Sequence, residues 1–359
     1  MEDVPWPVTH HRNEPGDIAS QIGPALEGRG YIGQRPQGEN RERALLRFTV
    51  RDRDRPLLTI RFDRLPTRYP YTLMIPQHQT EAILLDRLGA LGRRVYRPYS
   101  VVDLRQDVQG AEAKVAAAGA STQWIRARYI VGADGMHSLV RERAGIGFTG
   151  AAYEQSFVLA DVRLRWALEG EEVRLFFSSD GLVVIAPLPG GVHRIVATVD
   201  SAPEHPSLAD IQQLLDTRGP ITSAARIDTI VWSSRFRVHH RLADAYRPGR
   251  VLLAGDAAHV HSPAGGQGMN IGIQDALALG NALHAVVSGA RDAAALEEYE
   301  RSRRPIAQRV LELANRLTRV ATLSGRHKRA LRNFTIRVLD HIPAFRRSLA
   351  MDLAELHNR

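Results

Sequence analysis

One short stretch of the sequence combines an acidic residue, a proline, several glycines and the start of a helix. The run RVLLAG predicts a buried strand that ends at Gly255 and Asp256. A carboxylate at the carboxyl end of a parallel strand can accept hydrogen bonds from ribose hydroxyls. The glycines behind it let the backbone approach a ligand closely, and a helix start offers free N–H groups to negative charge. We predict that this stretch binds a cofactor through Gly255, Asp256, Pro263, Gly265, Gly266, Gly268, Met269 and Asn270. The alternative is a tight strand-to-helix turn without a ligand.

A second turn repeats the combination of acid and glycine. The run YIVGADG predicts a buried strand that ends in a turn containing Asp134, and Ser138 and Arg141 follow at a helix start. Asp134 can orient or neutralise a nearby arginine, and Arg141 can pair with a pyrophosphate. Asp134 and Arg141 are therefore candidate cofactor-binding residues. The alternative is a capped corner between a strand and a helix.

Other side chains near these turns could suggest different chemistry. His259 and His261 form a His-x-His pattern on an extended stretch, which places both rings on one side. A metal ion would need a third ligand, and none is adjacent, so we predict no metal site. Ser138 and Ser262 lack the G-x-S-x-G pattern of a hydrolase nucleophile, so hydrolase chemistry is not predicted.

The composition excludes several classes of protein. The chain has 359 residues, of which 44% are hydrophobic and 24% charged, which is typical of a globular protein and not of a disordered, collagen-like or coiled-coil chain. No apolar run reaches the ~18 residues of a spanning helix, and the first residues have no signal-peptide core. With 0 cysteines there is no disulfide, thiolate nucleophile or cysteinyl cofactor link. These features predict a cytoplasmic protein without a membrane partner.

The positive charge of the chain comes almost entirely from arginine. The formal net charge is +9, and only Lys114 and Lys328 among the 48 basic residues are lysines. The arginines are scattered and form no stripe, so we predict no nucleic-acid partner. General attraction for anionic small molecules is compatible with this charge.

Hydrophobic periodicity indicates the elements that must position these turns. Residues 44–62 predict a hairpin, and residues 80–91 predict a helix with Ile83, Leu84, Leu88 and Leu91 on one face. Three short strands are expected around residues 101–106, 113–118 and 122–127. Residues 153–240 predict a mostly antiparallel sheet with one helix around 208–215. Helices are also expected over residues 270–287 and 293–323.

The two turns resemble motifs of the flavin-dependent aromatic hydroxylases with the para-hydroxybenzoate hydroxylase fold. GADGMHSLVR is similar to the family's Asp-Gly motif, which serves FAD and the passing nicotinamide cofactor. AGDAAHVHSPAGGQGMNIGIQDA is similar to its Gly-Asp motif, whose aspartate holds the ribityl or ribose part of FAD. RYPYTLMIPQHQTEAILLDRL is similar to a segment whose glutamine or arginine, here Gln77, touches the flavin side chain. The resemblance covers about residues 44–320.

The resemblance implies a cofactor, a reaction and a class of substrate. NAD(P)H would reduce bound FAD, and the reduced flavin would react with O2 to give a C4a-hydroperoxide that hydroxylates an aromatic ring. The substrate would be phenolic or polyketide-like, covered by the sheet of residues 153–240. A histidine of the pair His259 and His261 is expected beside the flavin ribityl chain. No residue is identifiable from the sequence as a catalytic base.

The start of the chain departs from the family pattern. Family members begin with a strand, a GxGxxG turn and a helix that hold the FAD pyrophosphate. The run from Gly28 to Gly33 matches GxGxxG literally but does not follow an apolar strand, and we interpret it as a loop. Two expectations follow: the chain is truncated relative to the working protein, or it is a degenerate relative. The alternative function is therefore a non-catalytic, flavoprotein-like remnant or ligand-binding protein.

The expected fold class is α/β. It comprises an incomplete FAD-binding Rossmann-like domain, an inserted, mostly antiparallel β-sheet substrate domain and C-terminal helices. We expect an irregular N-terminal segment (1–43), the FAD-binding domain in two parts (44–150 and 246–323), the substrate domain (151–245) and a C-terminal helical tail (324–359).

Overall fold

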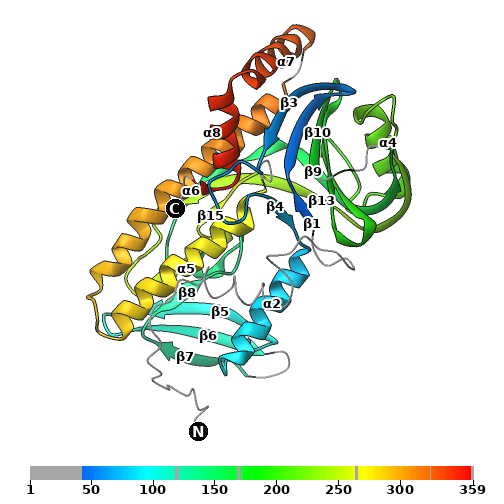
Figure 1. Cartoon of the computed structure of the whole chain (residues 1–359). Helices are drawn as coiled ribbons and strands as arrows, with labels where there is room; N and C mark the ends of the chain where they lie inside the picture. Colours follow the sequence, from blue (N-terminus) through cyan, green and yellow to red (C-terminus); the bar gives the residue numbers. More distant parts are fainter. Residues whose placement is uncertain are drawn as a thin grey trace. The chain divides into compact units, whose positions relative to one another are not determined.

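A computed structural model of the chain describes residues 43–117, 121–167, 170, 172–262, 266–323 and 325–356. These residues lie in one compact unit, Glu39–Arg359. The expected irregular segment 1–43, with its literal GxGxxG run, lies outside the described residues except for Arg43. The mixed α/β class expected from the sequence is confirmed (Figure 1).

An eight-stranded sheet forms the largest layer of the described fold (Figure 1). Its neighbouring strands pair antiparallel, except β10 and β2, which run parallel. In spatial order the strands are β15 (His259–Val260), β13 (Arg226–Ala243), β9 (Phe148–Arg165), β12 (Val192–Val199), β11 (Gly181–Pro187), β10 (Glu172–Ser178), β2 (Arg47–Asp52) and β3 (Arg55–Arg61). The antiparallel sheet predicted over residues 153–240 is therefore confirmed.

One face of this sheet carries a hydrophobic core. In β9 the side chains of Val158, Ala160 and Val162 are fully buried, which is the two-residue period of a strand with one covered face. Helix α4 (Leu208–Arg218) packs on this core through its buried residues Ile211 and Leu215. Its first turn is fixed by a capping box, and it corresponds to the helix expected around 208–215.

The hairpin predicted over residues 44–62 is present as β2 and β3. We expected these residues in the first part of the FAD-binding domain, and in the structure the hairpin forms the end of the eight-stranded sheet. Parallel pairing of β2 with β10 joins the β2–β3 hairpin to the antiparallel pair β10 and β11. Helices α7 (Arg326–Asp340) and α8 (Pro343–Leu353) pack on β3 and share a core with it. The helical tail thus covers the hairpin.

The two strands that lead into the motif turns form a separate parallel pair, β8 (Ile130–Gly132) and β14 (Val251–Leu253). All of β14 is buried, as predicted. The expectation of an equally buried strand at 129–131 is wrong, because Val131 is 40% exposed. Within the described part of the chain β8 pairs only with β14, so one of its edges carries no strand.

Shorter elements surround this pair. The three short strands that the sequence predicted are present as β5 (Tyr99–Gln106), β6 (Ala111–Ala117) and β7 (Gln123–Ala127), and they form an antiparallel sheet. Strand β1 (Arg43–Leu45) pairs with β4 (Thr72–Met74). Helix α2 (Gln77–Ala90) forms where a helix was expected. Its expected apolar face is not covered, since no α2 residue is buried and Leu84 is 40% exposed.

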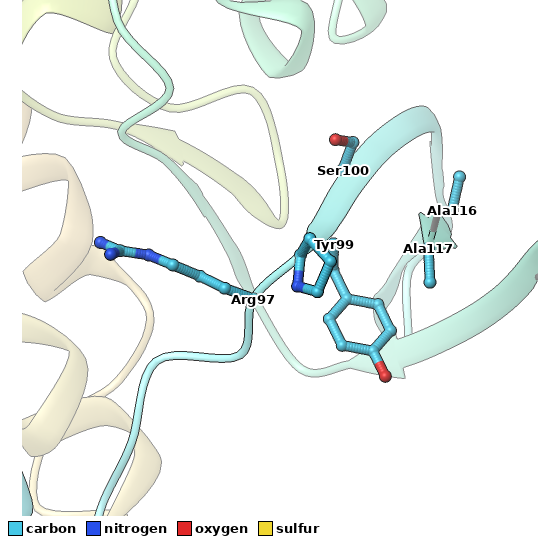
Figure 2. A pocket seen from close by; sticks show the side chains of 6 residues that line it. Arg97, Tyr99, Ser100, Ala116 and Ala117 are labelled. Carbon is cyan, nitrogen blue, oxygen red and sulfur yellow. The ribbon is translucent and has the colours of Figure 1, made fainter. Parts of the chain in front are cut away.

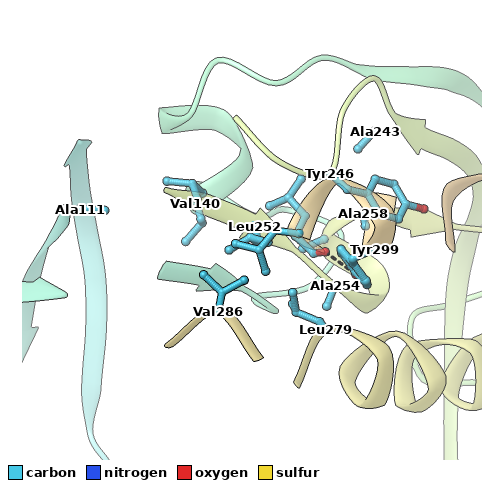
Figure 3. Close-up of a cluster of buried hydrophobic side chains, with 14 of the residues drawn as sticks. Ala111, Val140, Ala243, Tyr246, Leu252, Ala254, Ala258, Leu279, Val286 and Tyr299 are labelled. Atoms are coloured by element: carbon cyan, nitrogen blue, oxygen red, sulfur yellow. Dashed lines mark hydrogen bonds between the residues drawn. The ribbon is translucent and has the colours of Figure 1, made fainter. Parts of the chain in front are cut away.

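Two long helices pack beside β14. Helix α5 (Gly268–Val287) contacts α6 (Ala294–Ala321), and both were predicted. Tyr246 and Leu252 are fully buried in the core between these helices and β14 (Figure 3). Leu296 of α6 is fully buried in the same core. No helix in the described residues is long and apolar enough to cross a membrane. This core fixes the position of the Gly-Asp turn.

Candidate functional site

The carboxylate of Asp256 in the Gly-Asp turn is exposed. Strand β14 runs into a short 3-10 turn, Gly255–Ala257, in which Gly255 has a φ of +59° that suits glycine. A Cβ atom on Gly272 of α5 would lie 3.4 Å from the Cα of Gly255, so the helix packs directly against the turn. Asp256 is exposed and makes no hydrogen bond with the described residues. Its carboxylate is therefore free to accept hydrogen bonds from a ligand.

The start of α5 lies beside this turn. Gly268, Met269 and Asn270 form the first residues of the helix, and Met269 and Asn270 are exposed. Gly266, with a φ of +69°, precedes it. The unpaired N–H groups of a helix start favour negative charge on a ligand. Of the predicted cofactor-binding residues, Pro263 and Gly265 lie outside the described part of the chain.

A buried ionic cluster packs against the Gly-Asp turn. The carboxylate of Asp275 on α5 lies 2.6 Å from Nε2 of His259 and accepts a hydrogen bond from Nε of Arg303 at 2.7 Å. The N–H of Gly255 also donates to Asp275, at 3.3 Å. His259, Asp275 and Arg303 are all buried. The cluster thus joins the turn, α5 and α6.

Asp275 and Arg303 were not among the residues predicted from the sequence. A signal was available, because Asp275 is the one acidic residue in the mostly apolar helix GMNIGIQDALALGNALHAVV. A carboxylate on a helix that is buried by its neighbours needs a cation and hydrogen bonds. A search for arginine on the next helix would have pointed to Arg303.

Two tyrosines complete the packing around the cluster. The Tyr299 hydroxyl donates to the carbonyl of Leu253 at 2.7 Å (Figure 3), and the Tyr246 ring stacks on His259 with centroids 6.3 Å apart. Burial, and secondly the charge of Asp275, raises the pKa of both phenols, so both stay neutral. They rigidify the turn without adding charge.

The Asp-Gly turn is fixed by its own side chains. Asp134 accepts hydrogen bonds from the hydroxyl of Ser138 and, at 3.1 Å, from the N–H of Val140. Ser138 caps helix α3 (Leu139–Arg143) by accepting from the N–H of Arg141 at 2.9 Å. Asp134 and Ser138 therefore each satisfy one free N–H group at the helix start. The structure therefore contains the capped corner between a strand and a helix that the sequence offered as an alternative. A role of Asp134 in FAD binding stays a prediction.

Arg141 connects the two motifs. Its guanidinium donates to the carbonyl of Met136 at 2.8 Å and to the carbonyl of Ala257 in the Gly-Asp turn at 2.9 Å. It also lies over the ring of Phe148, with 3.8 Å to the ring centroid. Burial lowers the pKa of Arg141, although Asp134 opposes this shift. Residues 116 positions apart in the chain are thus held together at one place.

His261 faces the start of α5. Its Nδ1 lies 2.8 Å from the carbonyl of Ser262, so Nδ1 carries the proton and donates. The other nitrogen, Nε2, is buried without a hydrogen-bond partner among the described residues and lies near Gly268. Burial lowers the pKa of His261, which favours the neutral ring. Nε2 is therefore an acceptor beside the helix start, and a place beside the flavin ribityl chain stays a prediction.

Gln77 occupies a different element from the motif residues. It is the first residue of α2, is exposed, and its amide donates to Glu81 at 3.0 Å. No hydrogen bond in the described residues joins it to either motif turn. Its proposed contact with flavin stays a prediction.

A pocket lies at the end of the sheet of β5 and β6 (Figure 2). It is lined by Arg97–Ser100 and by Ala116 and Ala117, and Figure 2 shows the Arg97 side chain directed away from Tyr99. No group of three or more possible metal ligands occurs among the described residues. The convergent chemistry therefore lies at the two motif turns.

Comparison with known proteins agrees with this geometry. A sequence model of the family described as "FAD binding domain" matches residues 28–314. This chain belongs to the FAD-dependent aromatic hydroxylase family. It is 35% identical to a 12-dehydrotetracycline 5-monooxygenase/anhydrotetracycline 6-monooxygenase of Streptomyces rimosus over 80% of this chain and 59% of that protein. It is also 35% identical to pentachlorophenol 4-monooxygenase of Sphingobium chlorophenolicum, over 70% of this chain and 47% of that protein.

The fold of the family is confirmed by a solved structure. The p-nitrophenol 4-monooxygenase of Pseudomonas putida DLL-E4 superposes with a TM-score of 0.79 at 24% sequence identity, covering 94% of this chain and 86% of that chain. The family model and the curated relatives confirm the hydroxylase resemblance drawn from the two motif turns, and the solved structure confirms the fold. The chain spans about half the length of the curated relatives it matches.

Proposed function

We propose that this chain carries the site of an FAD-dependent monooxygenase that hydroxylates a phenolic or polyketide-like aromatic substrate with NAD(P)H and O2. Two relatives of this family are named for oxygenation of a tetracycline precursor and of pentachlorophenol. Both substrates named are aromatic or polycyclic. The proposal transfers this class of substrate, and no individual compound, to this chain.

The free carboxylate of Asp256 beside the start of α5 is the observation that carries the proposal. The turn holding it is set by a buried strand, by the close packing of Gly255 on Gly272, and by the buried Asp275 cluster. A polyol such as the sugar chain of FAD fits an exposed acceptor, and the helix start fits a ring system that gains negative charge. The residues present therefore fit FAD. When bound, FAD supplies electron transfer from the nicotinamide and activation of O2.

The protein's contribution would be binding, orientation and exclusion of water. Asp256 would hold the sugar chain, and Met269 and Asn270 would face the ring from the start of α5. The eight-stranded sheet, through β9 and β13, would cover the substrate and keep water from the reacting atoms. The finer route of oxygen transfer expected from the resemblance stays a prediction.

Isotope labelling tests the reaction type. The protein, loaded with FAD, is given NAD(P)H, 18O-labelled O2 and a panel of phenolic and polycyclic aromatic compounds. We expect faster NAD(P)H consumption with a substrate and one labelled oxygen atom in its product. Unlabelled product, or hydrogen peroxide alone across the panel, contradicts the proposal.

The second candidate is a flavoprotein-like binding protein without catalysis. Among the described residues no side chain of α2 is buried and β8 pairs only with β14, and this openness favours the second candidate, because a site for reactive flavin must be closed to water. Binding of FAD and of an aromatic ligand without turnover of NAD(P)H would select this candidate.

A further inference from the structure

Helix α7 carries a row of large apolar side chains on its exposed side. Leu331 and Phe334 are each 66% exposed, and Val338 is 46% exposed. Their spacing of three and four residues places them on one face of the helix. Ile342 follows directly after the helix, is 43% exposed and continues the row. These four residues form the α7 stripe.

The opposite face of α7 is fixed to the β2–β3 hairpin and its neighbours (Figure 1). The guanidinium of Arg332 is buried and lies over the ring of Phe177, 3.9 Å from the ring centroid. The amide of Asn333 donates to the carboxylate of Asp52 at 2.8 Å. Ile336, one turn after Arg332, packs into the same core. The helix is therefore held in an orientation that keeps the stripe in solvent.

The surroundings of the stripe are strongly basic. Residues 323–349 contain seven lysines and arginines and one acidic residue. That acid, Asp340, accepts a hydrogen bond from the N–H of Thr59 at 3.0 Å, so its carboxylate is engaged on the inner side of the helix. Five of the seven cations are exposed: Arg326, Lys328, Arg329, Arg337 and Arg347. The exposed side of α7 thus combines apolar side chains with an excess of positive charge.

We propose that α7 docks this protein on the surface of a membrane that contains anionic lipids. The stripe would enter the interface, and the cations would lie against the lipid headgroups. A helix with an apolar row and flanking lysine and arginine lies in the plane of such an interface, and each cation near the surface adds to the attraction. The prediction of no membrane partner rested on the absence of a spanning run, and a helix that lies on a surface needs none.

Other occupants fit the α7 stripe less well. A second copy of this chain would bring the cations of two α7 helices together, and like charges oppose that contact. A protein partner needs a surface of complementary shape, whereas the stripe lies on the convex side of a single helix. A lipid surface requires only an apolar row and positive charge, and both are present.

Sedimentation with lipid vesicles tests the proposal on the full chain. Vesicles of phosphatidylcholine alone are compared with vesicles that also contain phosphatidylglycerol. We expect the partition coefficient to be at least about tenfold higher with the anionic lipid and to fall as salt is added. The measurement needs no flavin, so its result is independent of the proposed function.

The first pair of variants tests the apolar side chains. Leu331→Ser combined with Phe334→Ser should lower partitioning on the anionic vesicles about tenfold or more. Because both side chains are exposed, circular dichroism and thermal unfolding should show an intact fold. The matched control is Val108→Ser combined with Ile221→Ser, since these side chains are 87% and 65% exposed elsewhere on the protein. The control should bind like the unmodified chain.

The second pair of variants tests the charge. Lys328→Glu combined with Arg329→Glu leaves the stripe intact and should remove the preference for anionic vesicles. Arg87→Glu combined with Arg94→Glu makes the same change in net charge at exposed residues in and near α2, and this control should keep most of the preference.

Four results would overturn the proposal. One is an absence of binding to either kind of vesicle, and another is equal binding to both. A third is binding that the stripe variant leaves unchanged, because the protein would then adsorb through its net charge alone. The fourth is self-association in analytical ultracentrifugation without lipid that the stripe variant abolishes, because this would assign the stripe to a second copy of the chain.

Discussion

Asp256 is the residue whose loss should affect flavin binding without affecting the fold. Its carboxylate is exposed and bonded to nothing described, so its removal leaves no buried group unpaired. We expect Asp256→Ala to weaken FAD binding by about 1–3 kcal/mol, the usual loss for a charged hydrogen-bond partner. Fluorescence titration measures the affinity, and Asp256→Asn, which keeps one acceptor, should lose less. Unchanged affinity in folded Asp256→Ala would remove this residue from the site.

Asp275 should behave in the opposite way, because its carboxylate is fully buried between a histidine and an arginine. Replacement by asparagine removes the charge and leaves the buried guanidinium of Arg303 without its negatively charged partner. We expect Asp275→Asn to lower the free energy of unfolding by about 3–5 kcal/mol. Asp228→Asn, which breaks the exposed pair with Arg165, should cost less than about 1 kcal/mol. Urea unfolding of both variants measures this, and equal losses would contradict a structural role for the buried cluster.

At the scale of elements, β9 and β13 approach each other closely at Gly150, the one glycine in the two strands. Gly150 has a φ of +144°, and a Cβ atom there would lie 2.0 Å from the carbonyl oxygen of His240. We expect Gly150→Ala to destabilise the protein by more than about 1 kcal/mol, because the strands must separate. Gly89→Ala is the control, since it lies in helix α2 with open space around it and should stabilise by about 0.5–1 kcal/mol. Thermal unfolding of both variants should show Tm shifts of opposite sign.

Elements with clear periodicity could be predicted from the sequence, and their neighbours could not. The β2–β3 hairpin was predicted from its alternation, but its pairing with β10 depends on contacts more than 100 residues apart. The helix at 77–90 was predicted from spacing, yet its apolar face is uncovered, because periodicity reports which face is apolar and not what covers it.

The site was predictable to the same extent. Asp256 was found because glycine, acid and helix occur together within a short run. The Arg141 contact with Ala257 and the Glu355 contact with α5 join parts of the chain that are distant in sequence, and only the tertiary fold shows them. The Asp275 cluster lies between these cases, since a lone acid in an apolar helix was a readable signal.

At the scale of the whole molecule, the buried Glu355 should make stability depend on pH. Its folded pKa of about 7 lies above the ordinary value of 4.5. As the pH rises from 4.5 to 7, the unfolded chain loses this proton first, so the folded state loses stability over that window. Below 4.5 both states are protonated and the group has no effect.

Glu355→Gln removes this titration. We expect the variant to gain about 2 kcal/mol in unfolding free energy relative to the unmodified chain between pH 5 and pH 8. Denaturant unfolding at several pH values measures the difference in unfolding free energy between the variant and the unmodified chain. The contributions of all other titrating groups cancel in this difference. Glu312 also accepts from a glutamine amide but is exposed on α6, so Glu312→Gln should show no such trend. A flat difference for Glu355→Gln would mean that the carboxyl group is not buried in solution.

The two long strands β9 and β13 have a mechanical consequence. They pair along nearly their whole length, from Phe148 opposite Ala243 beside the motif turns to Arg165 opposite Arg226 at the far end. Because the two strands are hydrogen-bonded over this length, they should resist bending. A displacement of their far end should therefore also move the end beside the motif turns. The pair of strands is weakest where its register shifts, at 227/229, 230/232 and 237/239. Bending should concentrate at the last of these, next to the histidines of β13 that lie nearest the turns.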